Sequence, residues 1–377
     1  MSVVSVRYSS SRTLAVSLLA AFVAVGCAGS GSNASAPGSD ASSPASSAAT
    51  SGQNAGKAGT PNASAPDAGA RRSTAELRAE QTPGFVRMQF DVLRLTALYD
   101  GRVDIDAKQL KNASANSIAQ LLRQGKQPAK GAVQTSVNAF LLDDGKGNIV
   151  LVDTGSADTM GENAGHLHKA LAASGYRAED VTAILLTHLH PDHAGGLLKD
   201  GALAFPNAQV YAAKQEADFW LSESIAQAAP EANRVYFAGA VKAVTPYQAS
   251  GRFHTFTSGK LPIEGFDAVA LHGHTPGHTG FMVSSGSEKL LLWGDVVHSH
   301  TTQFANPAIS LEFDNDLRMA RAARIKVLRE SARNGQWIAG AHMPFPGVGR
   351  VVTQGTGYRW VPLDFAQAMS AAEKRQP

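Results

Sequence analysis

The side chains best suited to chemistry gather in residues 187–196, which read THLHPDHAGG. Within six positions this stretch contains four potential metal ligands: His188, His190, Asp192 and His193. It follows the apolar run 183–186, which is short enough to be a buried strand, so the four side chains are expected at a strand end. His188 and His190 are two positions apart on extended chain and can hold one ion from the same side. Asp192 and His193 follow a proline, where the chain turns, and are expected to face a second ion.

The spacing His-x-His-x-Asp-His resembles the signature of the metallo-β-lactamase-fold hydrolases, in which later strands deliver further ligands. Three residues match that pattern: His278 within GHTPGHTG (273–280), Asp295 after the run 290–294, and His342 after the run 338–341. The resemblance implies two metal ions, one held by His188, His190 and His278, one held by Asp192, His193 and His342, and both bridged by Asp295. Histidine and carboxylate ligands suit zinc, although manganese, cobalt and iron also accept them. The expected cofactors are therefore two divalent transition-metal ions, with zinc first.

Other polar side chains are expected to support these ligands rather than bind metal. Asp153 ends the apolar run 149–152 and matches an aspartate that in the family supports the site from behind the ligands. With seven ligands already assigned, His274 is given a similar supporting position. His298 is expected to be supporting or structural for the same reason.

The pattern of strands and helices indicates an α/β (α+β) fold. Strands are expected at 85–99, 137–142, 149–152, 209–212, 253–256, 268–271, 280–283, 289–293 and 336–339, the last being the final core strand. Helices are expected at 159–174, from 214 onward and at 316–333, the last with Leu317 and Leu328 on its apolar face. Helices interleaved with strands suggest two sheets enclosed by helices. This agrees with the four-layer αββα sandwich that the resemblance implies.

The N-terminal segment differs in character from the rest of the chain. Residues 1–27 contain two arginines, an apolar run and Gly26-Cys27. This order resembles a bacterial lipoprotein signal peptide in which Cys27 is lipidated. Ala24 stands where such signals favour leucine, which leaves ordinary signal-peptide cleavage as an alternative. Residues 28–72 are rich in Ser, Ala, Gly and Pro and are expected to form a disordered tether before a hydrolase domain at 79–370. We therefore expect an exported, membrane-anchored protein that faces the periplasm or the cell exterior.

Composition restricts the partners. The 377 residues are 44% hydrophobic and 17% charged, which is ordinary for a globular protein and allows one large domain. The net charge is only +3 and no basic run occurs, so no nucleic-acid partner is expected. The sequence leaves the oligomeric state open, with a dimer as one alternative.

Several segments resemble one family more closely, methyl parathion hydrolase: LAFPN (203–207), QEADFWL (215–221), HMPFPG (342–347) and GYRWVP (357–362). The likeness extends from about residue 83 to 365 and includes segments without metal ligands. That family lines its substrate pocket with aromatic side chains, and Trp220 and Phe237 match such positions. Met160 stands where a third aromatic is expected, which puts the family's substrate preference in doubt.

Two adjacent cations would hold a bridging hydroxide, a strong nucleophile near neutral pH. Asp295 is expected to set the separation of the ions, and Asp192 to pass a proton. The expected function is hydrolysis of neutral esters, namely organophosphate triesters, lactones or aryl esters, because apolar pocket walls offer no cationic group to an anion. One alternative is a glyoxalase II-like thioesterase, and another is a non-catalytic metal-binding lipoprotein.

Overall fold

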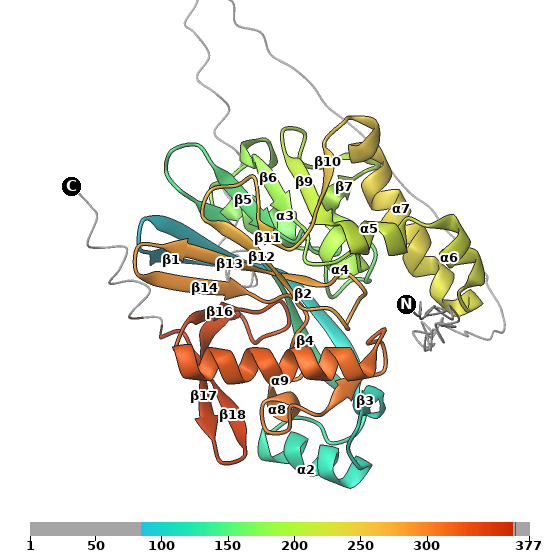
Figure 1. Cartoon of the computed structure of the whole chain (residues 1–377), viewed down its shortest axis with the longest axis vertical. Coiled ribbons are helices and arrows are strands. Elements are labelled where there is room, and N and C mark those ends of the chain that lie inside the picture. The colour runs from blue at the N-terminus through green and yellow to red at the C-terminus, as the bar shows by residue number, and fades with distance from the viewer. Residues whose placement is uncertain (1–83, 365, 367–377) are drawn as a thin grey trace, which may run out of the picture. The chain divides into compact units, whose positions relative to one another are not determined.

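The computed structural model describes residues 84–364 and 366 (Figure 1). The predicted signal peptide, the lipidation prediction at Cys27 and the predicted tether lie outside these residues. The described part of the chain forms two seven-stranded sheets, two short strand pairs and the helices around them. No helix in this part is long and apolar enough to cross a membrane.

The first sheet has the order β1-β2-β4-β5-β6-β9-β10. Its strands are β1 (Phe85–Phe90), β2 (Leu93–Asp106), β4 (Ala132–Asp143), β5 (Ile149–Val152), β6 (Ala183–Leu185), β9 (Gln209–Ala213) and β10 (Phe253–Phe256). The strands from β1 to β5 pair antiparallel, whereas β5, β6, β9 and β10 run parallel. Parallel neighbours need crossover connections, and the helices between these strands supply them.

The second sheet has the order β11-β12-β13-β14-β16-β17-β18. Its strands are β11 (Gly259–Lys260), β12 (Phe266–Ala270), β13 (Thr279–Ser285), β14 (Glu288–Leu292), β16 (Trp337–Ala339), β17 (Val348–Gln354) and β18 (Gly357–Pro362). Only β14 and β16 pair in parallel in this sheet, and α9 (Leu317–Asn334) connects them.

The remaining elements are short strands and helices. The strand pairs are β3 (Leu110–Lys111) with β15 (Ser310–Leu311), and β7 (Leu198–Lys199) with β8 (Ala202–Leu203). The other helices are α2 (Ala115–Gln124), α3 (Leu167–Ala173), α4 (Pro191–Ala194), α5 (Lys214–Trp220), α6 (Glu223–Ala228), α7 (Arg234–Ala249) and α8 (His300–Gln303), with 3₁₀ turns η1 (Ala107–Gln109), η2 (Ala178–Asp180), η3 (Gly195–Leu197) and η4 (Glu231–Asn233).

Three apolar clusters hold the layers together. Because side chains alternate along a strand, Phe140 of β4 packs between the sheets with Phe281, while the adjacent Leu141 packs with Val244 of α7. On the outer face of the second sheet, Leu291 packs in the cluster that includes Val327 of α9. The order is therefore helices, sheet, sheet, helix, which confirms the predicted αββα sandwich.

Three sequence predictions about elements were wrong. The predicted helix 159–174 is reduced to α3, because Gly161 and Gly165 adopt positive φ values of 78° and 88°. Leu317 on α9 is 38% exposed, and the buried face contains Arg324 instead. The strand predicted to be the last of the core is followed by the hairpin of β17 and β18, which extends the second sheet.

Candidate metal centre

The potential ligands lie at the carboxyl ends of neighbouring strands. β5 and β6 are parallel neighbours, so Asp153 after β5 lies beside the histidine motif after β6. β14 and β16 are also parallel neighbours, and they deliver Asp295 and His342 to one end of the second sheet. Gly294, with φ 55°, makes this approach possible, because a Cβ there would lie 2.6 Å from His278 Nε2. The fold thus gathers residues as far apart in the sequence as Asp153 and His342, which are 189 positions apart.

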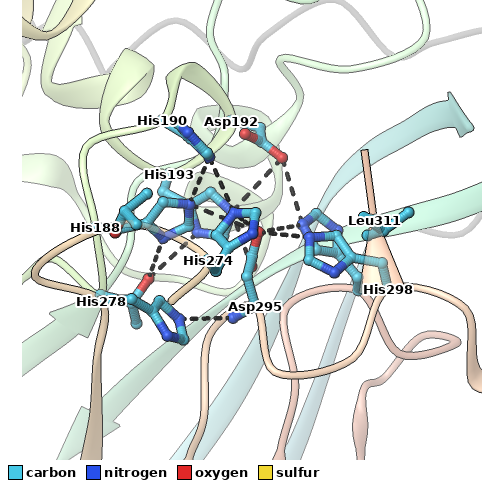
Figure 2. Close-up of polar contacts among 12 residues, drawn as sticks. His188, His190, Asp192, His193, His274, His278, Asp295, His298 and Leu311 are labelled. Carbon is cyan, nitrogen blue, oxygen red and sulfur yellow. Dashed lines mark hydrogen bonds and ion pairs between the residues drawn. The ribbon is translucent and has the colours of Figure 1, made fainter. Parts of the chain in front are cut away.

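One group of donors consists of three histidines beside Asp295 (Figure 2). His188 Nε2 and His274 Nε2 each lie 3.0 Å from His190 Nδ1. Oδ2 of Asp295 lies 3.1 Å from His274 Nε2 and 3.6 Å from His188 Nε2. These four residues can offer three nitrogens and one oxygen to a single ion.

A second group of donors consists of Asp192, His193 and His342. Oδ2 of Asp192 lies 3.5 Å from both His193 Nε2 and His342 Nε2. Asp295 also reaches this group, with Oδ1 3.1 Å from His193 Nε2 and Oδ2 3.1 Å from His342 Nε2. Asp295 therefore faces both groups, which is the position required of a residue that bridges two ions.

The donors fit divalent transition-metal ions. Ligands at zinc distances in a tetrahedron are separated by about 3.3 Å, and the separations between neighbouring donors in the first group range from 3.0 to 3.6 Å. His193 Nε2 and Asp295 Oδ1 are buried and lie 3.1 Å apart, but neither makes a hydrogen bond within the described residues. Buried polar atoms without partners are costly, and bound cations would satisfy both.

The structure places His274, and not His278, beside the other donors of the first group. His278 donates from Nδ1 to the Leu271 carbonyl at 2.9 Å, and its Nε2 accepts the Asp295 backbone N–H at 2.9 Å. Both ring nitrogens are therefore occupied within the protein. His274, four residues earlier in the same loop, reaches His190 instead. His278 directly precedes β13 and contacts the Asp295 loop. The ligand role of His278 and the supporting role of His274 stay predictions.

His298 is a further histidine at the centre. Its Nε2 lies 2.9 Å from Asp295 Oδ2, and its ring stacks on His342 with 4.7 Å between ring centroids. Asp295, His298 and His342 form another group with metal-ligand spacing. The sequence signal for His298 is its position three residues after Asp295. In a turn that follows a strand, residues three positions apart lie close together.

Asp153, which the sequence predicts to support the site, lies beside His193 and Thr187. One oxygen lies 2.9 Å from His193 Nδ1 and also accepts the Thr187 hydroxyl, while the other accepts the Thr187 backbone N–H. A carboxylate behind a histidine fixes the ring so that the opposite nitrogen faces the ion. The Asp153 backbone adopts φ 62°, a conformation uncommon for a residue other than glycine and enriched at functional sites.

A second buried carboxylate supports His274. Asp314 Oδ1 lies 2.9 Å from His274 Nδ1, and Asp314 Oδ2 lies 3.6 Å from the Arg324 guanidinium. Arg324 is 1% exposed and also donates to the carbonyls of Val296 and Ile309. This chain of contacts links α9 to the donor groups. The sequence analysis missed both residues, since neither lies in a recognisable motif.

The electrostatics of the centre favour the ligand forms of several residues. Burial holds the pKa of His188 and that of His190 well below the ordinary value, so both rings are neutral and can bind a cation. Burial alone would raise the pKa of Asp295, but the surrounding histidines, first among them His193, hold it well below the ordinary value. Burial lowers the pKa of His274, but Asp295 and Asp314 raise it to about 9. His274 must therefore lose a proton before it can bind a cation at neutral pH.

The predicted pocket aromatics lie next to the centre but inside the core. Trp220 and Phe237 are each 2% exposed and pack on each other, with 4.7 Å between ring centroids. The Trp220 ring meets His190 edge-on at 5.3 Å. Tyr236, which is partly exposed, lies 6.2 Å from the His190 ring. Met160 is also partly exposed. The pocket roles of Trp220, Phe237 and Met160 stay predictions.

Residues 132–346 match the model of the Metallo-beta-lactamase superfamily. The chain belongs to this superfamily. Among solved structures, the superfamily hydrolase AbOPH is 39% identical, with a TM-score of 0.72, over 76% of this chain and 99% of that one. A dizinc quorum-quenching lactonase, AidC, is 30% identical, with a TM-score of 0.68, over 74% of this chain and 98% of that one.

Among curated proteins, an N-acyl homoserine lactonase from a Bacillus species is 28% identical over 213 residues, which are 50% of this chain and 74% of that protein. A probable metal-dependent hydrolase from Staphylococcus aureus, 17% identical with a TM-score of 0.61, shares the fold. Superfamily membership and the clustered histidines and aspartates confirm the prediction of a metal-dependent hydrolase.

Proposed function

We propose that the protein is a dizinc hydrolase of neutral esters, with lactones, aryl esters and phosphotriesters as candidate substrates. The observation that carries this proposal is Asp295, whose carboxylate faces two adjacent groups of donors. Support also comes from the likeness to AidC, which is described as a dizinc lactonase and was solved with an N-acyl homoserine product. Bound zinc would supply a Lewis acid and an activated water.

The protein's own residues divide the remaining tasks. Asp295, 3% exposed, would hold the two ions at a fixed separation. Asp192 has a side chain that is 12% exposed and therefore reaches toward solvent from the second group. Burial disfavours its charged form, but His193 and His342 lower its pKa well below the ordinary value. Asp192 is thus an anion at neutral pH, which is the form in which a carboxylate binds a cation.

A cavity beside the second group gives substrate a place to bind. It measures about 140 Å³, and its lining includes Thr135, Ser136, His298 and His342. Its hydroxyl and imidazole groups suit a compact, uncharged polar group such as an ester or a lactone ring. No lysine or arginine is among its lining residues, so it offers no full positive charge to an anion.

The test is hydrolysis by the full chain before and after removal of metal by a chelator, and after zinc is restored. The substrates are an N-acyl homoserine lactone, an aryl ester, a neutral aryl phosphotriester, the corresponding charged diester and a glutathione thioester. We expect zinc-dependent turnover of the neutral oxygen esters. Turnover that persists without metal, or that is confined to the thioester, would overturn the proposal.

We further propose that the chain is similar in activity to the methyl parathion hydrolase family. We also propose that it is exported as a lipoprotein. The first part is supported by the shared segments QEADFWL and HMPFPG. The second is supported by the apolar run before Cys27, which lies outside the described residues. Incorporation of labelled fatty acid into the wild type and not into Cys27→Ser tests the lipid anchor.

A further inference from the structure

Glu216, on α5, is a buried carboxylate that the proposed chemistry does not use. Its side chain is fully buried, and it contacts two loops. Oε1 accepts the backbone N–H of Leu189 at 3.0 Å. Oε2 accepts the Thr275 hydroxyl at 2.7 Å and the Gly277 backbone N–H at 2.8 Å. A single side chain thus joins segments that are more than 80 residues apart in sequence, from 189 to 275.

Both loops carry donors of the first group. Leu189 lies between His188 and His190, and Thr275 directly follows His274. The helix and the second loop are in close contact, since a Cβ on Gly277 would lie 2.2 Å from the Glu216 backbone nitrogen. The three nitrogens of the first group come from these two loops, so their spacing depends on how the loops are held together.

Burying a carboxylate is costly unless it is well hydrogen-bonded, and the three donors named above are all neutral. An apolar residue here would avoid that cost but would remove the acceptor of the Leu189 and Gly277 N–H groups. What the buried carboxylate provides in return is a fixed geometry, because one planar group holds hydrogen-bond donors from two loops at once. The contacts do not extend to His342 or to Asp192, which belong to the second group.

We propose that Glu216 is a positioning residue that fixes the His188–His190 loop to the His274 loop and thereby sets the zinc affinity of the first group. The proposal rests on the dizinc function proposed above. Residues behind metal ligands typically contribute a factor of roughly 10–100 to metal affinity. Because Glu216 contacts only the first group's loops, its loss should weaken one binding event and spare the other.

The test is Glu216→Gln in the full chain, with binding of Zn²⁺ followed by competition with a chromogenic chelator. Glutamine keeps the size of the side chain, but its NH₂ group must face either the Leu189 N–H or the Gly277 N–H. We expect one of the two zinc-binding events to weaken by roughly 10–100-fold and the other to stay unchanged. Asp218→Asn is the matched control, because Asp218 lies on the same helix but pairs with Lys214 at the surface. It should leave both events unchanged.

Thr275→Val removes one donor with little change in volume and should weaken the same event by a smaller factor. It decides the question if Glu216→Gln fails to fold. The Tm of each metal-free variant separates positioning from general packing. Two unchanged affinities, or two equally weakened affinities with a lowered metal-free Tm, would overturn the positioning role. A wild-type protein that binds fewer than two zinc ions would instead overturn the proposed function.

Discussion

His274 and His278 provide the sharpest single test of the centre, because they lie in one loop and only His274 lies beside the other donors of the first group. His274 contributes Nε2 to the first donor group, 3.1 Å from Asp295 Oδ2. His274→Ala removes a ligand, so zinc affinity at this position should fall by more than the roughly 100-fold typical of residues behind ligands. The metal-free protein should stay folded, since the ring's buried partner Asp314 keeps its contact with Arg324.

His278→Ala should lower the stability of the protein and leave its zinc binding intact. It removes the partners of the Leu271 carbonyl and the Asp295 N–H, two backbone groups beside a fully buried side chain. Each unsatisfied buried group costs about 1–3 kcal/mol, so the free energy of unfolding should fall by about 2–6 kcal/mol. The protein should still bind two zinc ions where it is folded. His278→Gln, whose amide oxygen can accept the Asp295 N–H, should recover part of the lost stability.

The assays are urea denaturation of the metal-free variants and metal analysis after dialysis against zinc. Loss of one ion from His278→Ala, together with two ions in His274→Ala, would refute the assignment from the structure. That result would restore the ligand set predicted from the sequence.

Four further predictions concern the same centre. Asp295→Ala should abolish nearly all ester hydrolysis and leave a soluble protein. His166→Ala, at an exposed position, should change neither the activity nor the solubility. Wild-type activity in the Asp295 variant would contradict the bridging position. Asp314→Asn should weaken zinc binding by roughly 10–100-fold, because His274 loses the carboxylate behind it; chelator competition measures this. Since burial lowers the pKa of His274 but Asp295 and Asp314 raise it to about 9, its ring is protonated below that pH and zinc must displace the proton. The apparent zinc affinity should therefore rise by about tenfold per pH unit between pH 7 and 9, and calorimetry in buffers of different ionisation enthalpy should detect the released proton. Trp220→Ala should lower kcat/KM for a neutral aryl phosphotriester, through lost contact with His190, and unchanged kinetics would remove Trp220 from the pocket.

The sequence predicted the layers of the fold because its signals are local. Short apolar runs that end in Asp153, Asp295 or a histidine indicate a buried strand followed by a polar residue of the centre. Each of these strands is present in the structure. Helix limits were less predictable. Positive φ at Gly161 and Gly165 interrupts a segment whose composition alone suits a helix. A glycine's conformation depends on tertiary contacts, as at Gly165, where a Cβ would lie 2.0 Å from the Ala157 carbonyl oxygen.

The positions of His274 and His278 relative to the other donors were not accessible from spacing. Both lie in the loop between β12 and β13, and the path of this loop decides which ring faces the other donors. That path depends on Pro276, on Gly277 and on the Glu216 carboxylate that binds the loop from another helix. Contacts of this kind come from segments far apart in the sequence, and without the fold they leave no pattern.

Buried charged residues explain the remaining omissions. Arg324 falls on a helix rich in charge, yet it is 1% exposed beside Asp314. A residue of this type is almost never fully buried unless it is paired, so the pair had to be found before either member could be interpreted.

The charges of the centre also bear on substrate choice. Asp192 and Asp295 lie among the donors, and Asp153, Asp314 and Glu216 lie directly behind them. Two divalent cations and the Arg324 guanidinium would balance these five carboxylates, so the occupied centre has little net charge to attract an anion. A phosphodiester would have to lose its hydration without such compensation, whereas a neutral ester would not. The preference for neutral esters therefore follows from the residues behind the ligands as much as from the walls of the pocket, and substitution of Asp314 by asparagine should make the charged diester a relatively better substrate.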